Sequence, residues 1–395
     1  MNPQQERSAG FTLVEASPLD RLFSRIGLST ADPRGARRLV AVLVLLTWAP
    51  LLLLSASAGT AWGTGVGLPF LCDVEVQVRL LFAVPVLILA DGIVHGRLLG
   101  VAQQFSERGL LTDENRAQFA AVLASVARLR QSRLAEALML ALVYGVGVVF
   151  LWRTQIALDL PSWFGTTVDG VLQPSHAGWW FGLVSLPVFQ FLLLRWFWRQ
   201  AIWAVFLWKV SRIDLHYMPK HPDAAGGIGF LARASYAFVP VLLAQSGMLA
   251  GTFANRIFYA GSGLADFRIE LAGLVALMLM IVFAPLLFFC RRLDTAKRSG
   301  LREGGRLVER YLREFDDKWI RGGGAPGESL VGSADIQSLA DLRQAYALVK
   351  DMRWIPFSLR DLLHVGIAAS LPLLPLSLTM FPAEQLLDQF LKILF

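Results

Sequence analysis

The sequence predicts an all-α fold: a polytopic membrane helix bundle with about seven transmembrane helices and helical cytoplasmic extensions. One observation behind this prediction is composition, since 55% of the 395 residues are apolar and the mean hydropathy is +0.52, more than a soluble core requires. Another is that several apolar runs reach the roughly 20 residues needed to cross a hydrocarbon layer about 30 Å thick. A helix satisfies every backbone N–H and C=O group within one segment, as that layer demands.

Seven apolar stretches are predicted to span the membrane. In chain order they are residues 39–57, 78–96, 134–152, 179–209, 236–258, 271–290 and 363–381. The second is less regular, because Arg79 and Asp91 lie near its ends. The seventh contains Pro372 and Pro375, which disrupt an α-helix, so it is open to a second interpretation as a re-entrant hairpin.

The distribution of basic residues predicts the orientation. Thirty Lys and Arg residues lie in the N-terminal tail and in alternate loops, against four on the opposite side. Because Lys and Arg accumulate in cytoplasmic segments, we expect a multi-pass protein of a bacterial inner (plasma) membrane with its N-terminus in the cytoplasm. The same bias explains the net charge of +7. We therefore expect the lipid bilayer as a partner and no nucleic acid; a homo-oligomer is compatible with the sequence.

Four regions follow from this topology. They are a cytoplasmic tail at 1–38, a membrane domain at 39–290 with six spans and a cytoplasmic helical loop at 97–133, a cytoplasmic helical region at 291–360, and a C-terminal membrane segment with an interfacial helix at 361–395. In the third region Val308, Tyr311 and Phe315 recur at helical spacing. Ser358 and Asp361 form a capping box that predicts the start of the last span.

Two arginines inside an apolar stretch are the strongest candidates for function. Arg195 and Arg199 lie four residues apart in the fourth stretch and share one helical face. A charge in hydrocarbon costs several kcal/mol unless it is paired or hydrated. The pair can line an anion path or hold a carboxylate or phosphate ligand. Alternatively, it forms an interhelical ion pair with Asp91 or Glu136. In a third interpretation the helix breaks near Arg195 and residues 196–208 lie along the interface as an aromatic belt.

The depth of these arginines depends on whether the fourth stretch is one helix. If it is, Arg195 is predicted near the membrane midplane and Arg199 one turn closer to the cytoplasm. Arg199 then lies about 15 Å from Lys209 along the helix, too far for its side chain to reach that interface. Gln190, on the same helix, is a further candidate for the ligand or ion path.

Asp91 and His95 form the one compact pair of titratable groups in an apolar stretch, at positions i and i+4. A proton relay needs such groups along one path. The alternative is an interfacial pair at the cytoplasmic end of the second stretch, where water reaches it. Asp91 therefore joins the arginines as a candidate for the ligand or ion path.

A polar loop follows the fourth stretch and reads HYMPKHPDAAGGIGFL over residues 216–231. His221, Asp223 and one more histidine offer three metal ligands without a fourth, which is a weak signal. Gly226 and Gly227 offer backbone N–H groups to a phosphate, but no Gly-Lys-Ser/Thr follows. The remaining interpretation is a tight turn with an Asp-stabilised cap, in which glycine adopts positive φ. We expect the turn, with neither a metal nor a cofactor.

The function favoured by these features is a channel or transporter for a small solute or ion, with an anion preferred because of the arginine pair. The alternative is a membrane scaffold or signalling subunit that acts through the cytoplasmic helices at 301–320 and 333–353. A membrane-embedded lipid-modifying enzyme would use the His221 and Asp223 loop. The sequence contains no recognisable Ser/His/Asp set, carboxylate pair or zinc helix, so it assigns no catalytic residue and favours a protein that is not an enzyme.

Two motifs resemble recurring signatures of an uncharacterised family of bacterial polytopic integral membrane proteins. The first is HPDAAGGIGFL at 221–231 and the second is GSADIQSLADL at 332–342. The second is followed at helical spacing by Tyr346, Val349 and Met352. The resemblance covers the fourth to seventh stretches and the helices between them, about half of the chain. It implies a shared multi-span fold and carries no known activity, so it assigns no functional residue.

Overall fold

The computed structural model describes residues 21, 23, 27, 28, 30 and 32–380, except 64, 148–161, 169–170, 325–328 and 331. Within these residues the chain is almost entirely helical, which confirms the predicted fold class. The described residues form one sheet of two antiparallel strands, β1 (Gly165–Val168) and β2 (Val171–Pro174). The predicted interfacial helix near the C-terminus lies outside the described residues.

Six helices in the described part of the chain are long and apolar enough to cross a membrane. They are Pro33–Ser57, Val74–Glu107, His176–Val210, Phe230–Ala260, Leu264–Ile320 and Leu359–Leu378. Each contains one of the predicted stretches or most of it, and the first begins inside the predicted N-terminal tail. The remaining stretch, 134–152, begins in α8 (Arg133–Leu142) and η3 (Val143–Gly147). Its other residues lie outside the described part, so this span stays a prediction.

Each long helix is a series of shorter segments. The first span consists of α3 (Pro33–Thr47) and α4 (Ala49–Ser57), and the short helix η1 (Phe70–Cys72) follows it. The second span consists of α5 (Val74–Gln77), η2 (Val78–Ala83) and α6 (Val84–Glu107), and α7 (Asp113–Arg130) comes after it. The next two consist of α10 (His176–Trp180), η4 (Phe181–Ser185), α11 (Leu186–Val210), α12 (Phe230–Ser235), η5 (Tyr236–Phe238) and α13 (Val239–Ala260). The last part consists of η6 (Leu264–Phe267), α14 (Arg268–Phe283), η7 (Ala284–Phe289), α15 (Cys290–Phe315), η8 (Asp316–Ile320), α16 (Ala334–Asp351), α17 (Leu359–Ser370) and η9 (Leu371–Met380).

Prolines explain where the segments change. A proline is the second residue of α6, α11, α13 and η7: Pro85, Pro187, Pro240 and Pro285. Proline has no N–H to donate and its ring clashes with the carbonyl four residues earlier. The turn before it therefore relaxes to a π or 3₁₀ conformation, as in η2, η4 and η5. The last span behaves in the same way, because its proline-containing part, η9, continues α17 as a 3₁₀ helix instead of turning back as a hairpin.

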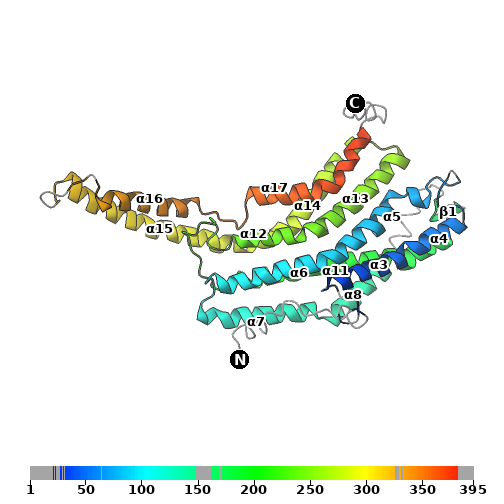
Figure 1. Ribbon diagram of the computed structural model, residues 1–395, viewed down its shortest axis with the longest axis horizontal. Coiled ribbons are helices and arrows are strands. Elements are labelled where there is room, and N and C mark those ends of the chain that lie inside the picture. Colours follow the sequence, from blue (N-terminus) through cyan, green and yellow to red (C-terminus); the bar gives the residue numbers. More distant parts are fainter. Residues whose placement is uncertain are drawn as a thin grey trace.

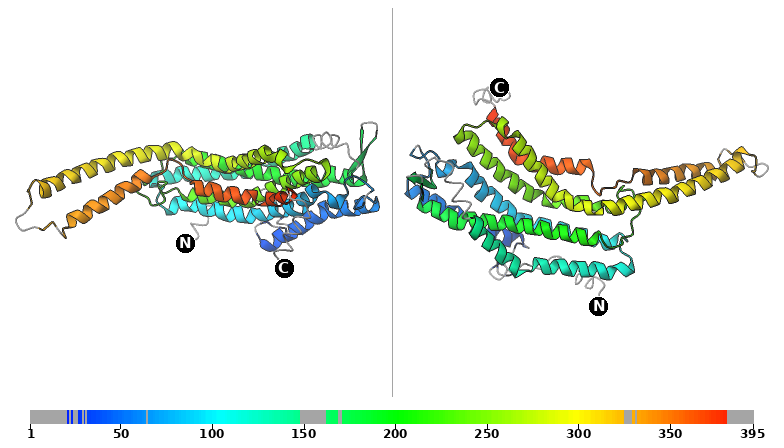
Figure 2. Two further views of the ribbon diagram at one scale, coloured as in Figure 1. Left: turned by 90° about the horizontal axis from the view of Figure 1, so that it is seen from above. Right: turned by 180° about the vertical axis from the view of Figure 1, so that it is seen from behind.

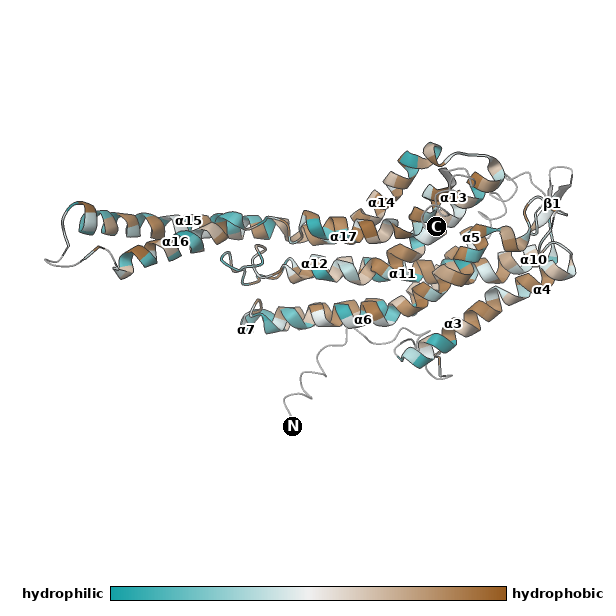
Figure 3. Ribbon diagram, turned by 45° about the horizontal axis from the view of Figure 1, so that its top comes forward, coloured by the Kyte–Doolittle hydropathy of each residue, from teal (hydrophilic) through white to brown (hydrophobic). Residues whose placement is uncertain are grey.

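The molecule is elongated, with the spans side by side and α15 and α16 projecting from one end as a pair of antiparallel helices (Figures 1 and 2). We call this end the projecting end and the opposite end, which carries β1, the strand end. Apolar residues dominate the spans, whereas α15 is mostly polar and α16 mixes polar and apolar residues (Figure 3). The helices Val74–Glu107 and His176–Val210 contain 34 and 35 residues. At 1.5 Å per residue they are about 50 Å long, which exceeds the roughly 30 Å of hydrocarbon.

The helix ends near the projecting end pack into an aromatic core. Phe105 of α6 contacts Phe119 of α7, Phe206 of α11 and Phe230 of α12, with ring centroids 5.1–6.3 Å apart. All four rings are buried. α7 therefore folds back against α11, and the predicted helical loop at 97–133 consists of the end of α6 together with α7.

A buried carboxylate organises the strand end. Asp73 caps α5 by accepting from the Val76 N–H at 3.1 Å. Its two oxygens also accept from the Trp163 indole at 2.9 Å and from the Asn255 amide at 2.8 Å. Asn255 in turn accepts from the Val74 N–H at 3.0 Å. These bonds join the start of the second span to the end of α13 and to the segment before β1. The hydrogen bonds of Asp73 described above therefore have a structural role.

Candidate functional site

Helix α11 carries both arginines without interruption. It runs from Leu186 to Val210 through Arg195 and Arg199, so the interpretation in which the helix breaks near Arg195 is wrong. Trp196 is buried instead of lying at an interface, and its indole N–H donates to the Leu87 carbonyl of α6 at 2.9 Å. This bond fixes the rotation of α11 and directs the arginines towards the space beside α6.

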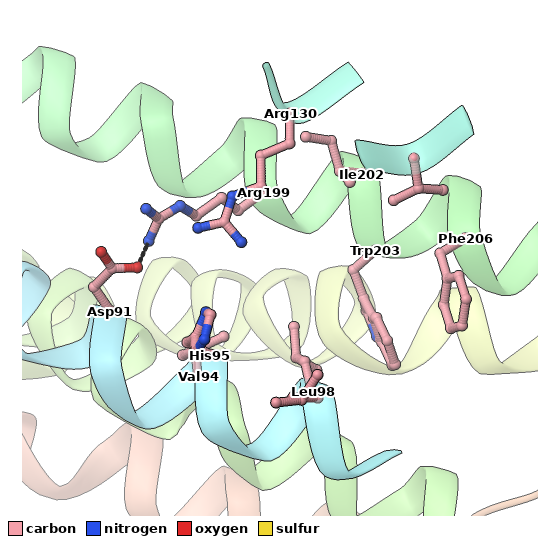
Figure 4. Close-up of a pocket in the computed structure, with 11 residues that line it drawn as sticks. Asp91, Val94, His95, Leu98, Arg130, Arg199, Ile202, Trp203 and Phe206 are labelled. Carbon is pink, nitrogen blue, oxygen red and sulfur yellow. Dashed lines mark hydrogen bonds and ion pairs between the residues drawn. The ribbon is translucent and has the colours of Figure 1, made fainter. Parts of the chain in front are cut away.

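Arg199 forms an ion pair with Asp91 of α6 (Figure 4). The side chains of Arg199 and Asp91 are only 15% and 12% exposed. Thr30 donates its hydroxyl to the other carboxylate oxygen, and the Arg199 guanidinium lies over the Trp196 ring at 4.9 Å. The interhelical ion pair is therefore confirmed, with Asp91 as the partner. Its charges are compensated as a buried pair requires, by mutual attraction and additional hydrogen bonds.

Two cavities meet at this ion pair. The larger, of about 240 Å³, lies between α3, α6, α8 and α11, and Arg195 lines it. The smaller, of about 60 Å³, lies between α6, α7 and α11, and His95 and Arg130 line it (Figure 4). Asp91 and Arg199 line both cavities. The ion pair therefore lies between the two cavities. The larger cavity is inside the spans, and the smaller one is where α7 packs beside α6 and α11.

The residues lining the cavities carry an excess of positive charge. Among the described lining residues, three are arginines, at 130, 195 and 199, and one is a carboxylate, Asp91. Counting His95 as neutral, these described residues together carry a net charge of +2. Guanidinium groups bind carboxylates and phosphates through paired, charge-assisted hydrogen bonds. The arrangement favours an anion over a cation or a neutral solute.

The contact between Thr30 and Asp91 places the arginines relative to the first span. Thr30, which contacts Asp91, precedes the first span, which begins at Pro33. The ion pair is therefore level with the beginning of that span, and Arg195, four residues from Arg199, lies about 6 Å further in. The structure defines no bilayer boundaries, so the midplane position of Arg195 stays a prediction; what it does show is that α11 also packs against α7.

Two other candidates for the path have different surroundings. His95 lines the smaller cavity together with Asp91, so the predicted i, i+4 pair faces one space. Gln190 lines neither cavity. The Gln190 side chain packs so closely against Gly147 that a Cβ atom on residue 147 would overlap the Gln190 amide. The buried Oε1 atom of Gln190 has no hydrogen-bond partner among the described residues. The structure does not bring Gln190 to the arginines.

The loop between α11 and α12 is a tight turn built around Asp223. Its carboxylate accepts from the backbone N–H groups of Ala225 at 2.8 Å, Gly227 at 3.1 Å and Gly229 at 2.9 Å. Burial acts to raise the pKa of Asp223, but these three hydrogen bonds outweigh it and hold the pKa below its ordinary value. The φ angles of Gly226 and Gly227 are 64° and 94°, as expected for a turn that uses glycine.

This turn holds the base of the projecting helices. Arg353, just after α16, donates its N–H to the Ala224 carbonyl at 2.7 Å and its guanidinium to the Asp223 carbonyl at 3.1 Å. His221 lies beside Asp223, with Nδ1 3.0 Å from its carboxylate oxygen. The described residues contain no group of three or more His, Cys, Asp or Glu side chains able to hold a metal ion. The contacts of His221, Asp223, Gly226 and Gly227 are structural, and they give no support to a lipid-modifying enzyme at this loop.

Sequence reasoning missed two residues of the site. Thr30 lies in the tail before the first span, and Arg130 lies in the cytoplasmic helical loop predicted at 97–133, where no residue was named as a candidate. The amphipathic pattern of 113–130 predicts a helix, but periodicity does not show that this helix folds back along α11. The aromatic residues at 105, 119 and 230 were the available signal, since large apolar side chains in polar loops indicate a surface that packs against another element.

Fold and site together define a multi-pass helical membrane protein whose buried polar centre is an arginine–aspartate pair between two cavities. No protein family, curated protein or solved structure matches the chain. The resemblance to the bacterial membrane family therefore stays a prediction, and function rests on the geometry of this site.

Proposed function

We propose that the protein transports a small anionic solute or ion across a bacterial inner membrane, past the pair Asp91 and Arg199. The observation that carries this proposal is that one ion pair divides two cavities whose lining has a positive excess. A structural ion pair alone needs neither the further arginines, Arg130 and Arg195, nor a cavity on each side.

In this proposal Asp91 acts as an internal anion that competes with the solute. While the site is empty of solute, the Asp91 carboxylate neutralises Arg199 and keeps the two cavities separate. An incoming anion takes its place on Arg199, and the hydrogen bond from Thr30 stabilises the released carboxylate. Because the solute changes which groups are paired, it provides the differential binding energy that a conformational change requires.

The proposed orientation puts the N-terminus and the projecting helices in the cytoplasm. Arg34, Arg37 and Arg38 are exposed in the first turns of α3, and α15 carries many further basic residues. Lys and Arg gather on the cytoplasmic side of membrane proteins. The smaller cavity then faces the cytoplasm, and the larger one lies within the cytoplasmic half of the spans.

Anion flux into proteoliposomes tests the proposal. Removing Arg199 alone leaves a buried, unpaired carboxylate and costs about 3–5 kcal/mol of stability, so the informative variant combines Asp91→Asn with Arg199→Gln and adds Arg195→Gln. We expect flux of chloride, inorganic phosphate and a small carboxylate to fall at least tenfold. The matched control is Arg79→Gln, because Arg79 is another part-buried arginine, paired with Glu75 within the same helix and away from both cavities.

Thermal unfolding of each purified variant shows whether it is folded. Flux that is the same in the wild type and in the folded triple variant removes the arginines from the mechanism. Flux that is absent from the wild type for all three anions contradicts transport of small anions altogether.

One observation favours a second function, that of a membrane scaffold or signalling subunit. The projecting helices expose the apolar side chains of Leu307, Leu312 and Leu348 at 46%, 41% and 38%. If the protein has this second function, purification from native membranes should yield a stoichiometric partner, and deletion of residues 301–353 should remove that partner. Recovery of the homo-oligomer alone would count against this function.

A further inference from the structure

We infer that the larger cavity binds an anionic amphiphile: one molecule with a phosphate or carboxylate group at one end and an apolar chain at the other. This inference rests on the same cavity as the proposed function and specifies the chemical class of its ligand. A free anion shares the chemistry of the charged group but not that of the chain.

The cavity has a charged end and an apolar end. Arg195, Arg199 and Asp91 form the charged end. Along α11 the lining continues to Pro187 and Val188, which lie about 18 Å from Arg199 by helix rise. Most of the remaining lining is apolar, including Leu39 and Leu43 of α3, Leu140 of α8, and Phe191 and Leu192 of α11. Such walls match an apolar chain, whereas a small anion can bind only at the charged end of the cavity.

The direction of the cavity agrees with the way a lipid lies in a bilayer. Its charged end is level with Thr30, just before the first span begins. The exposed arginines of the first turns of α3, from Arg34 to Arg38, lie near the same level. Leu39 and Leu43 lie further along α3, inside the apolar part of the span. A headgroup at the arginines therefore sits at the edge of the hydrocarbon, and its chain runs inwards beside the helices.

The charge of the lining selects an anionic headgroup. Two arginines and one aspartate are the charged side chains among the described residues that line this cavity, so the described lining has a net charge of +1. A phosphate or carboxylate neutralises this excess and can bind both guanidinium groups in the paired geometry that they prefer. A zwitterionic headgroup brings its own cation next to the arginines and loses most of this gain.

Binding to the purified full-length protein tests the inference, with native mass spectrometry as the measurement. The probes are phosphatidylglycerol, phosphatidylcholine and inorganic phosphate. We expect the wild type to retain phosphatidylglycerol at least tenfold more strongly than phosphatidylcholine. Arg195→Gln should remove this preference, because it deletes one of the two guanidinium groups that line the cavity, and the control Arg79→Gln should keep it.

A second pair of variants separates a lipid from a free anion. Leu43→Trp fills the apolar end of the cavity and should weaken phosphatidylglycerol binding at least fivefold. Leu45→Trp, on the same helix but 64% exposed and outside the lining, should not. Equal retention of the two lipids by the wild type overturns the inference, since it means that lipid fills the cavity without recognition. Competition by inorganic phosphate that is unaffected by Leu43→Trp overturns it in favour of a free anion.

The two proposals fail in different ways. Selective retention of phosphatidylglycerol without flux of any small anion supports the ligand class and contradicts small-anion transport. Small-anion flux that is insensitive to Leu43→Trp, in a protein that shows no lipid preference, contradicts the ligand class and supports transport.

Discussion

Asp91 provides the negative charge that compensates the Arg199 guanidinium, and both side chains are largely shielded from solvent. Arg199 and Thr30 each bind one of its carboxylate oxygens, and Arg195 adds its charge from one turn away along α11. A carboxylate with two cations beside it can release one of them at a smaller cost than an isolated pair can. The ion pair between Asp91 and Arg199 is therefore suited to break and re-form when an anion binds, as well as to hold the two helices together.

Asp223 shows how a carboxylate can serve structure alone, and it gives a pH-dependent prediction. Its folded-state pKa lies below the ordinary value, so its contribution to stability is complete above the unfolded pKa of about 3.9. This contribution disappears as the pH falls through the folded pKa. Thermal unfolding of the wild type and of Asp223→Asn should therefore differ by a constant amount between pH 5 and 7. The difference should shrink below pH 4.

His221 and Arg353 are the charged or titratable neighbours that bear on this test. A difference between the wild type and Asp223→Asn that shrank between pH 7 and 5 would contradict the assignment of the pH dependence to the Asp223 carboxylate. A variant with unchanged stability at pH 7 would contradict the structural role assigned to Asp223.

The turn that anchors the projecting helices can be tested as an element through Gly226. A Cβ at this position would lie 3.0 Å from the Met352 Cε and 3.3 Å from the Leu293 Cδ2, in a backbone with φ of 64°. Gly226→Ala should therefore loosen the base of α15 and α16 and speed limited proteolysis near residues 321–332. We expect a loss of about 1–3 kcal/mol in stability, from backbone strain and from overpacking.

Gly261 provides the matched control for this element. The φ angle of Gly261 is 67°, and a Cβ atom on this residue would meet nothing within 4 Å. Gly261→Ala therefore introduces backbone strain like that of Gly226→Ala, but no overlap with a neighbouring side chain. Protection of the projecting helices should be unchanged in Gly261→Ala. If both variants had equal effects on proteolysis at 321–332, the contact between the turn and Met352 would not be what holds the helices.

At the scale of the whole molecule, the native cysteines allow a test of the orientation. Cys72 is exposed at the strand end of the second span, so a membrane-impermeant maleimide should label it from outside intact spheroplasts. Arg302→Cys, introduced on the exposed face of α15 into a Cys72→Ala background, should react only after the membrane is permeabilised. Labelling of residue 302 in intact spheroplasts would reverse the proposed orientation.

The sequence was a good guide to the overall architecture because hydrocarbon imposes a strong local constraint. Runs such as 236–258 and 271–290 need no tertiary information to be recognised as spans. The position of Arg130 did need it, because it depends on α7 packing against α11. The Asp91 partner was among the predicted alternatives, since buried cations need carboxylates, whereas Thr30 had no local signal that linked it to residue 91.

The junction at η7 has a mechanical consequence for the projecting helices. Pro285 interrupts regular α-helical bonding there, and α15 then continues for 26 residues without another proline. At 1.5 Å per residue this rod is about 39 Å long, so a ten-degree swing about the junction carries its far tip through about 7 Å. A rearrangement of less than an ångström at this junction would therefore move the far end of α15 by several times that distance.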